Sequence, residues 1–226
     1  TYALEKEFFT DNIAASRFIH LTLYITGCWL LYLLVTVWFP SKGRNYALFA
    51  TLIFLVHPIH TEVVANLKSR DEMMTFIFFC VQFLALATYI KKDKLKWLGL
   101  SALGFLLELL SKEIAVSFLA LVPLSLFVLH KQTLKKTFSL SLPFVGVVLL
   151  YFGLRAAFVE SSTEVAETEF AVINNALSQA ENFGERLASS AYLVMLYFYK
   201  LIWPVKLSWD YSYSVITVIK WRSVTG

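Results

Sequence analysis

Seven apolar runs separated by short polar connections dominate this sequence and restrict the folds open to it. They are residues 17–39, 46–56, 73–90, 95–110, 114–129, 137–159 and 187–203. A helix needs about 20 apolar residues to cross a bilayer, within a range of roughly 17–25. The first, third and sixth runs reach that length, whereas run 46–56 has only 11 residues and must tilt, extend into its flanks or stop inside a cavity. We therefore expect an all-α, polytopic transmembrane helical bundle.

The composition excludes a soluble globular protein. Hydrophobic residues make up 58% of the chain and charged residues 16%, against about 25% charged in soluble domains. The net charge of +4 is spread over short connections, so we expect no nucleic-acid surface. Cys28 and Cys80 both lie in apolar runs, which argues against a disulfide framework. With no repeat and no linker, 1–226 is interpreted as a single transmembrane domain. It begins at Thr1 and not Met and ends on SVTG, so we expect a fragment with residues missing at both ends.

The charges of the connections alternate along the chain. Residues 40–45, 91–96 and 130–136 carry nine Lys or Arg and a single acid. The opposite set, at 57–72, 111–113 and 155–186, has five bases and ten acids. Cytoplasmic connections of membrane proteins are enriched in Lys and Arg. We expect the first set in the cytoplasm and the second on the outer side, in the periplasm or the lumen of the endoplasmic reticulum.

The outer connection HPIHTEVVANLKSRDE, residues 57–72, is the first candidate site. If it continues as a helix, Glu62, Asn66 and Arg70 share one face at spacings of four residues. A carboxylate, an amide and a guanidinium suit a substrate with hydroxyls and a phosphate. Arg70 also lies on the side that topology disfavours for bases, which favours an anion-binding role. The alternative is a solvated connection in which these residues, with Asp71, make only local pairs.

His57 and His60 lie three residues apart, with Glu62 close by. This spacing allows a divalent cation, but a zinc-type site needs a third well-placed ligand. Two histidines at a helix start more often form hydrogen bonds with the backbone than bind a metal ion. We expect no metal site here, and a divalent cation is the one cofactor that the residues leave open.

The tripeptide SKE, residues 111–113, interrupts an otherwise apolar stretch and predicts a tight turn on the same outer side. Lys112 would add a second cation for a phosphate, and Glu113 would orient it. The alternative is a helical hairpin that simply needs polar residues at its tip. Glu108 lies one turn deeper, where it faces the bundle interior or pairs with Lys112.

Two further features lie toward the C-terminus. Apolar residues recur at helical spacing within 160–186, which predicts an amphipathic helix on the outer surface. In LSWDYSY, Asp210 stands between Trp209 and Tyr211, a composition that can hold a sugar ring by stacking. An aromatic belt at the membrane interface explains the same residues. Counting spans places 204–216 on the cytoplasmic side unless run 187–203 is re-entrant.

Together, HPIHTEVVANLKSRDE, SKE and the stretch from NNALSQAENFGERL to KLSWDYSYSVI resemble the transmembrane-and-TPR O-mannosyltransferase-like family, bacterial members included. These are membrane glycosyltransferases of the GT-C class. The resemblance implies a GT-C-like fold, a polyprenyl- or dolichyl-phosphate sugar donor and transfer to a protein hydroxyl on the outer side. It also implies a tetratricopeptide region beyond these residues and an acidic pair in an outer loop preceding Thr1. It carries over to His57, His60, Glu62, Arg70, Asp71, Lys112, Glu113 and Asp210.

The implied enzyme assigns a role to each candidate. Glu62, Asp71, His57 and His60 would deprotonate or orient the acceptor hydroxyl and sugar. The substrate-binding set comprises Arg70, Lys112, Glu113, Asn66, Trp209, Asp210 and Tyr211. The partners would be the lipid-phosphate donor, a protein acceptor and the bilayer, in the bacterial inner membrane or in the endoplasmic reticulum of a eukaryote. Two alternatives remain: a non-catalytic subunit of a larger membrane complex, in which the charges join helices, and a transporter, for which the paired broken helices are missing.

Overall fold

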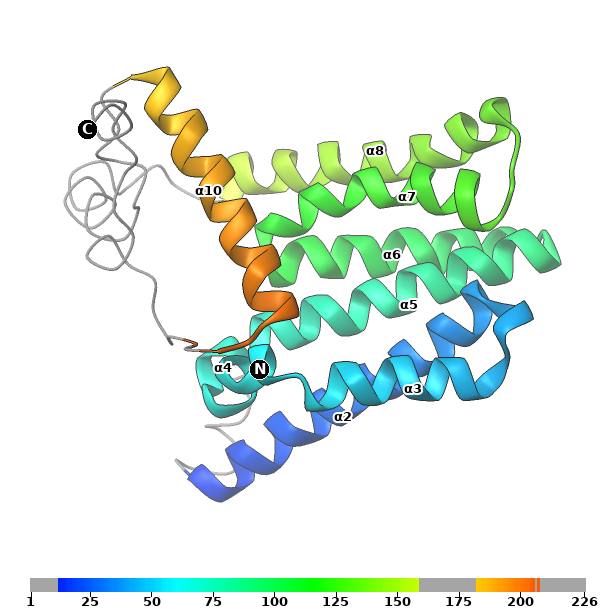
Figure 1. Cartoon of the computed structure of the whole chain (residues 1–226). Coiled ribbons are helices and arrows are strands. Elements are labelled where there is room, and N and C mark those ends of the chain that lie inside the picture. Colours follow the sequence, from blue (N-terminus) through cyan, green and yellow to red (C-terminus); the bar gives the residue numbers. More distant parts are fainter. Residues whose placement is uncertain (1–11, 159–181, 206, 208–226) are drawn as a thin grey trace. The chain divides into compact units, whose positions relative to one another are not determined.

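The computed structural model describes residues 12–158, 182–205 and 207 (Figure 1). The α-helices are α2 (Ile13–Trp38), α3 (Gly43–Val56), α4 (Thr61–Ala65), α5 (Arg70–Lys92), α6 (Leu95–Ser111), α7 (Leu121–Leu124), α8 (Leu134–Phe158) and α10 (Phe183–Ile202). Shorter helical turns connect them: η1 (Pro40–Lys42), η2 (Pro58–His60), η3 (Leu67–Ser69), η4 (Glu113–Ala120) and the π-helical η5 (Ser125–Leu129). Each of the seven predicted apolar runs is helical, so the all-α prediction is confirmed.

Three helices are long and apolar enough to cross a membrane among the described residues: α2, α5 with η3, and α8. These are the three runs whose length predicted a span. Helix α3 is shorter, and after a bend of 50° it is followed by η2 and α4. Pro58, at the start of η2, lacks the backbone N–H that would continue α3. The polytopic membrane architecture predicted from the sequence is therefore confirmed.

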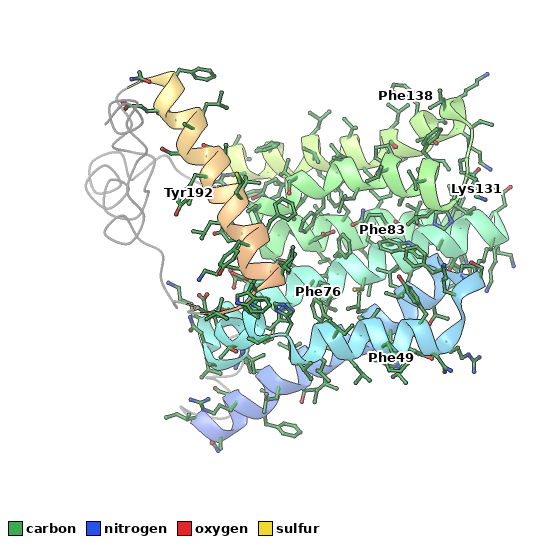
Figure 2. All side chains as sticks on the ribbon, in the orientation of Figure 1. Phe49, Phe76, Phe83, Lys131, Phe138 and Tyr192 are labelled. Carbon is green, nitrogen blue, oxygen red and sulfur yellow. The ribbon has the colours of Figure 1, made fainter. Side chains whose placement is uncertain are left out.

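The chain divides into two compact units, residues 1–158 and 159–226; the described residues are 12–158 in the first and 182–205 and 207 in the second. In the first, α5 packs against both α2 and α6, and α6 also packs against α8. Buried aromatic side chains fill the interior, for example Phe83 at 1% exposure, whereas Phe49 on α3 is 65% exposed (Figure 2). Such exposed apolar side chains suit a lipid environment.

Helices α5 and α6 pack closely against each other at Gly104. A Cβ atom placed on Gly104 would lie 3.2 Å from the backbone N and Cα of Gln82. Beside it, the Ser101 hydroxyl donates a hydrogen bond of 2.9 Å to the Gln82 carbonyl. Small residues at helix crossings allow this approach in membrane proteins. The pair therefore forms a close hairpin that connects the two ends of the bundle.

In the second unit, helix α10 begins after Asn182, whose side-chain oxygen accepts a hydrogen bond of 2.9 Å from the Glu185 amide. The helix ends before Trp203. It matches the seventh apolar run. The amphipathic helix predicted within 160–186 lies almost wholly outside the described residues. Trp209, Asp210 and Tyr211 lie outside them as well, and the single-domain assignment stays a prediction.

Candidate functional site

A cavity of about 420 Å³ lies where α2 passes the connection between α3 and α5. Its lining comes from three places: one face of α2, the end of α3, and the chain from η2 into α4. The lining residues are Arg17, His20, Leu21, Tyr24, Leu55, Val56, His57, Pro58, His60, Thr61, Val64 and Ala65. The cavity thus combines a cation and three imidazoles with an apolar wall.

Helix α2 presents Arg17, His20 and Tyr24 to the cavity at spacings of three and four residues, which places them on one helix face. The His20 ring is 1% exposed, and its Nε2 lies 2.8 Å from the Val63 carbonyl oxygen. Because a carbonyl only accepts, Nε2 carries the proton. The Nδ1 atom is buried and has no hydrogen-bond partner among the described residues. Tyr24 donates to the Leu55 carbonyl at 2.9 Å, so α2 is bonded to both α3 and α4.

The two histidines predicted as catalytic also line this cavity. The Ile59 amide donates to His57 Nδ1 at 3.2 Å, which leaves Nε2 as the protonated nitrogen of a neutral ring. The His60 ring packs 4.2 Å from the Phe54 ring and 6.2 Å from the His57 ring, measured between centroids. Burial lowers the pKa of His60 below its usual value of 6.5, and His57 lowers it further. His60 is therefore a neutral hydrogen-bonding group near pH 7.

The chain after His60 does not continue as one helix, so the predicted shared face of Glu62, Asn66 and Arg70 is wrong. Helix α4 ends at Ala65, and Asn66 has φ −92° and ψ 107°, an extended conformation. The Asn66 side-chain oxygen accepts a hydrogen bond of 3.1 Å from the Lys68 amide. Asparagine side chains often bond the nearby backbone in this way and interrupt helices. Glu62 lies exposed on α4 and is not part of the cavity lining.

Arg70 is almost completely buried, at 2% exposure. Its Nη2 donates a hydrogen bond of 2.9 Å to the Ser16 carbonyl on α2. The guanidinium of Arg70 thus holds the start of α5 against α2, next to Arg17. In place of a shared helix face with Glu62 and Asn66, Arg70 makes a hydrogen bond between α5 and α2.

Lys112 pairs with the acids at the start of α5. Its ammonium lies 2.5 Å from Glu72 and 3.8 Å from Asp71. Glu113 forms an ion pair with Arg155 of α8. Within residues 12–158, these pairs connect α5, η4 and α8 in the way that the scaffold alternative requires. The SKE turn itself is present, because Lys112 is extended between α6 and η4.

Glu108 points into the bundle rather than toward Lys112. It is 0% exposed, and neither carboxyl oxygen has a hydrogen-bond partner among the described residues. The pairing of Glu108 with Lys112 is therefore not made.

The sequence reasoning missed three cavity residues: Arg17, His20 and Tyr24. The signal was present as three polar side chains at helical spacing within an otherwise apolar run. A divalent-cation site at His57 and His60 would need a third ligand. In the parts of the chain that the structure describes, no three His, Cys, Asp or Glu side chains are grouped so that they could hold a metal ion.

Two family models match consecutive parts of the chain. Residues 2–158 match the model described as dolichyl-phosphate-mannose-protein mannosyltransferase. Residues 164–223 match the model described as protein O-mannosyl-transferase TMTC, DUF1736. No solved structure matches the chain.

Individual relatives agree with the family models. The chain is 26% identical to protein O-mannosyl-transferase Tmtc1 of Drosophila melanogaster over 220 residues, which is 89% of this chain and 25% of that protein. It is 28% identical to human protein O-mannosyl-transferase TMTC2 over 209 residues, 80% of this chain and 24% of the relative. The chain spans about a quarter of the length of the curated relatives it matches. Because the first model covers most of its length, the chain belongs to the dolichyl-phosphate-mannose-protein mannosyltransferase family.

Proposed function

We propose that this chain forms the donor-binding membrane part of a glycosyltransferase that moves a sugar from a polyprenyl- or dolichyl-phosphate to a protein hydroxyl. The observation that carries the proposal is the cavity at the end of α2, with Arg17, His57 and His60 beside an apolar wall. A phosphate linked to both a sugar and a prenyl chain needs these two surfaces together. The relatives' names, protein O-mannosyl-transferase, make mannose the first sugar to test.

The apolar wall would hold the lipid chain of the donor. Leu21, Leu55 and Val56 line the cavity and are 47%, 38% and 73% exposed. A prenyl chain lying against them would remain in the bilayer while its phosphate reached the polar residues. Burial of such apolar surface stabilises binding by about 25 cal/mol per Å².

The polar residues would bind the phosphate and sugar. The Arg17 guanidinium would balance the charge that grows on the phosphate as it leaves. His57 would donate from Nε2 to a phosphate or sugar oxygen, and neutral His60 would hold a sugar hydroxyl. Arg70 and Lys112 would keep the helix ends in place, since each is already bonded to protein groups.

In the reaction, the acceptor oxygen would bond to the anomeric carbon while the bond between that carbon and the phosphate oxygen breaks. The hydroxyl proton must pass to a base, for which a carboxylate is the suitable group. At this end of the bundle Glu62 and Asp71 are the available acids, and the family resemblance adds an acidic pair preceding Thr1. Trp209, Asp210 and Tyr211 remain candidates for holding the sugar or the acceptor. The cavity would then face the periplasm or the lumen of the endoplasmic reticulum.

Transfer of radiolabelled sugar from a polyprenyl-phosphate donor to a protein acceptor tests this proposal with the full-length protein. Arg17→Gln should lower transfer about tenfold or more, the usual effect of losing a charged hydrogen bond. His57→Ala with His60→Ala should also lower transfer. Lys68→Gln, at an exposed position outside the cavity, is the matched control and should retain parental activity. Parental transfer by Arg17→Gln, with normal membrane insertion, would contradict the proposed site.

The scaffold alternative has one observation in its favour, the ion pairs of Lys112 and Arg155 that join helix ends. It predicts that charge removal at these pairs weakens folding while no variant affects transfer specifically. The same assay separates the two functions. An enzyme loses transfer in Arg17→Gln at unchanged stability, whereas a scaffold has no transfer activity to lose.

A further inference from the structure

The end of the bundle away from the cavity carries an almost purely positive surface. Three connections meet there: α2 to α3, α5 to α6, and η5 to α8 (Figure 1). Their bases are Lys42, Arg44, Lys91, Lys92, Lys94, Lys96, Lys131, Lys135 and Lys136, all exposed, with Asp93 as the single acid. Within residues 12–158 none of these nine bases takes part in an ion pair. We call this set the basic end.

Trp97 contacts two lysines of the basic end. The ammonium groups of Lys92 and Lys96 lie 5.4 Å and 5.6 Å from the centroid of its ring. Its indole Nε1 is buried and has no acceptor in the described part of the chain. An indole N–H can only donate, so an oxygen acceptor from outside the protein would complete it. An acceptor oxygen can reach that nitrogen only if the side chains around Trp97 move. Two of these neighbours, Lys92 and Lys96, have exposed side chains.

His130 lies in the connection between η5 and α8, which is part of the basic end. Burial lowers the pKa of His130, and the positive charge of Lys91 lowers it further. Lys91, at the end of α5, therefore acts electrostatically on the connection before α8. Gln132 donates to the His130 carbonyl at 3.0 Å, which orders the backbone beside Lys131. The Nε2 atom of His130 is a second buried polar atom without a partner in the described part of the chain.

Apolar side chains lie among these bases. Leu95, Leu134 and Phe138 are 74%, 73% and 70% exposed, and each is within two residues of a lysine (Figure 2 labels Phe138 and Lys131). A surface for a soluble anion has no need of exposed leucine and phenylalanine. A surface that lies at the boundary of a bilayer needs both kinds of residue, with Trp at the level of the headgroups.

We propose that the basic end binds the phosphate headgroup of an anionic phospholipid around Trp97. Lys92 and Lys96 would pair with the phosphate, its oxygens would accept from the Trp97 indole, and the acyl chains would lie beside Leu95 and Phe138. Clusters of four to eight bases next to membrane helices bind anionic lipids in this way. This site is separate from the cavity and does not depend on the proposed transferase activity.

The test compares phosphatidylglycerol with phosphatidylcholine as lipids added to the purified full-length protein. Lipid binding is measured by native mass spectrometry, together with the unfolding midpoint. We expect preferential retention of phosphatidylglycerol. Each lysine near the headgroup contributes about fivefold to binding, so Lys92→Gln with Lys96→Gln should weaken it at least tenfold. Lys92→Arg with Lys96→Arg keeps the charge and should bind as the parent does, and Lys68→Gln should leave binding unchanged.

Several outcomes would overturn the inference: equal retention of the two lipids, parental phosphatidylglycerol binding by the double Gln variant, or equal stabilisation by inorganic phosphate, which would indicate a site for soluble anions. If the double Gln variant does not fold, lipid binding by the parent protein at different salt concentrations is the test. Its preference for phosphatidylglycerol must then fall at about 1 M salt, where the Debye length is ~3 Å. A preference that ignores salt would exclude a charge-based headgroup site.

Discussion

At the cavity end of the bundle, acids and bases occur together and bond to each other or to the backbone: Lys112 with Glu72, Glu113 with Arg155, and Arg70 with the Ser16 carbonyl. At the basic end, nine bases accompany a single acid, and none of the nine is paired in the described part of the chain. The ion pairs join helix ends to each other. The bases that form no ion pair are exposed and remain available to a partner outside the protein. Four predictions test this difference.

The largest expected effect is that of Arg70→Ala. The change removes a side chain that is 2% exposed, together with the hydrogen bond that its Nη2 donates to the Ser16 carbonyl. We expect the free energy of unfolding to fall by about 2–4 kcal/mol, from the cavity and the lost hydrogen bond. Chemical denaturation in detergent measures it, with Lys68→Ala as an exposed control that should change stability by less than about 0.5 kcal/mol. Full stability with lost sugar transfer would instead make Arg70 a substrate-binding residue.

The hairpin that joins the two ends is tested at Gly104. In Gly104→Val, the new side chain must displace the Gln82 backbone, which lies 3.2 Å from the added Cβ. Such overpacking costs about 1–3 kcal/mol. Gly99→Val on the same helix is the matched control, because nothing lies within 4 Å of its added Cβ. Equal unfolding midpoints for the two variants would contradict the close α5–α6 approach.

A direct comparison of the two ends pairs Lys112→Gln with Lys135→Gln. The first leaves Glu72 and Asp71 without their cation, and we expect a loss of about 0.5–1 kcal/mol, since all three side chains are partly exposed. The second removes an exposed charge that forms no ion pair within residues 12–158, and it should leave the unfolding midpoint in phosphatidylcholine within error of the parent. Destabilisation by Lys135→Gln equal to that by Lys112→Gln would remove the distinction between the ends.

The smallest effect concerns two half-buried histidines, His60 and His130. Both have a pKa below the usual 6.5 in the folded chain. The unfolded chain therefore binds protons more readily, and stability should decline as the pH falls below about 6.5. Lys91→Gln removes a charge that lowers the pKa of His130, so it should lessen the decline at that histidine while leaving His60 unaffected. Titration of the two rings by NMR measures the two pKa values. An unchanged His130 pKa in Lys91→Gln would contradict the electrostatic effect of Lys91 on His130.

The cavity residues show where sequence reasoning was sufficient and where it was not. His57 and His60 were identified as candidates from their place beside a short apolar run, and both line the cavity. Glu62 was expected to share a face with Arg70, but the Asn66 side chain bonds the Lys68 amide and interrupts the helix. The sequence does not predict Arg17, His20 and Tyr24 as cavity residues. They lie in an apolar run, and nothing local indicates which other segment of the chain packs against them.

The sequence by itself determined the seven helical segments, the membrane class, the separation of charges between the two sets of connections and the family resemblance. These follow from local composition and spacing, since the bilayer requires long apolar helices and topology distributes the bases. Only the tertiary structure decided which polar groups meet: α2 with the His57–His60 connection, Lys112 with Glu72, and Arg70 with the Ser16 carbonyl. Contacts between segments far apart in the chain depend on how the helices pack, and a single sequence carries no direct record of that packing.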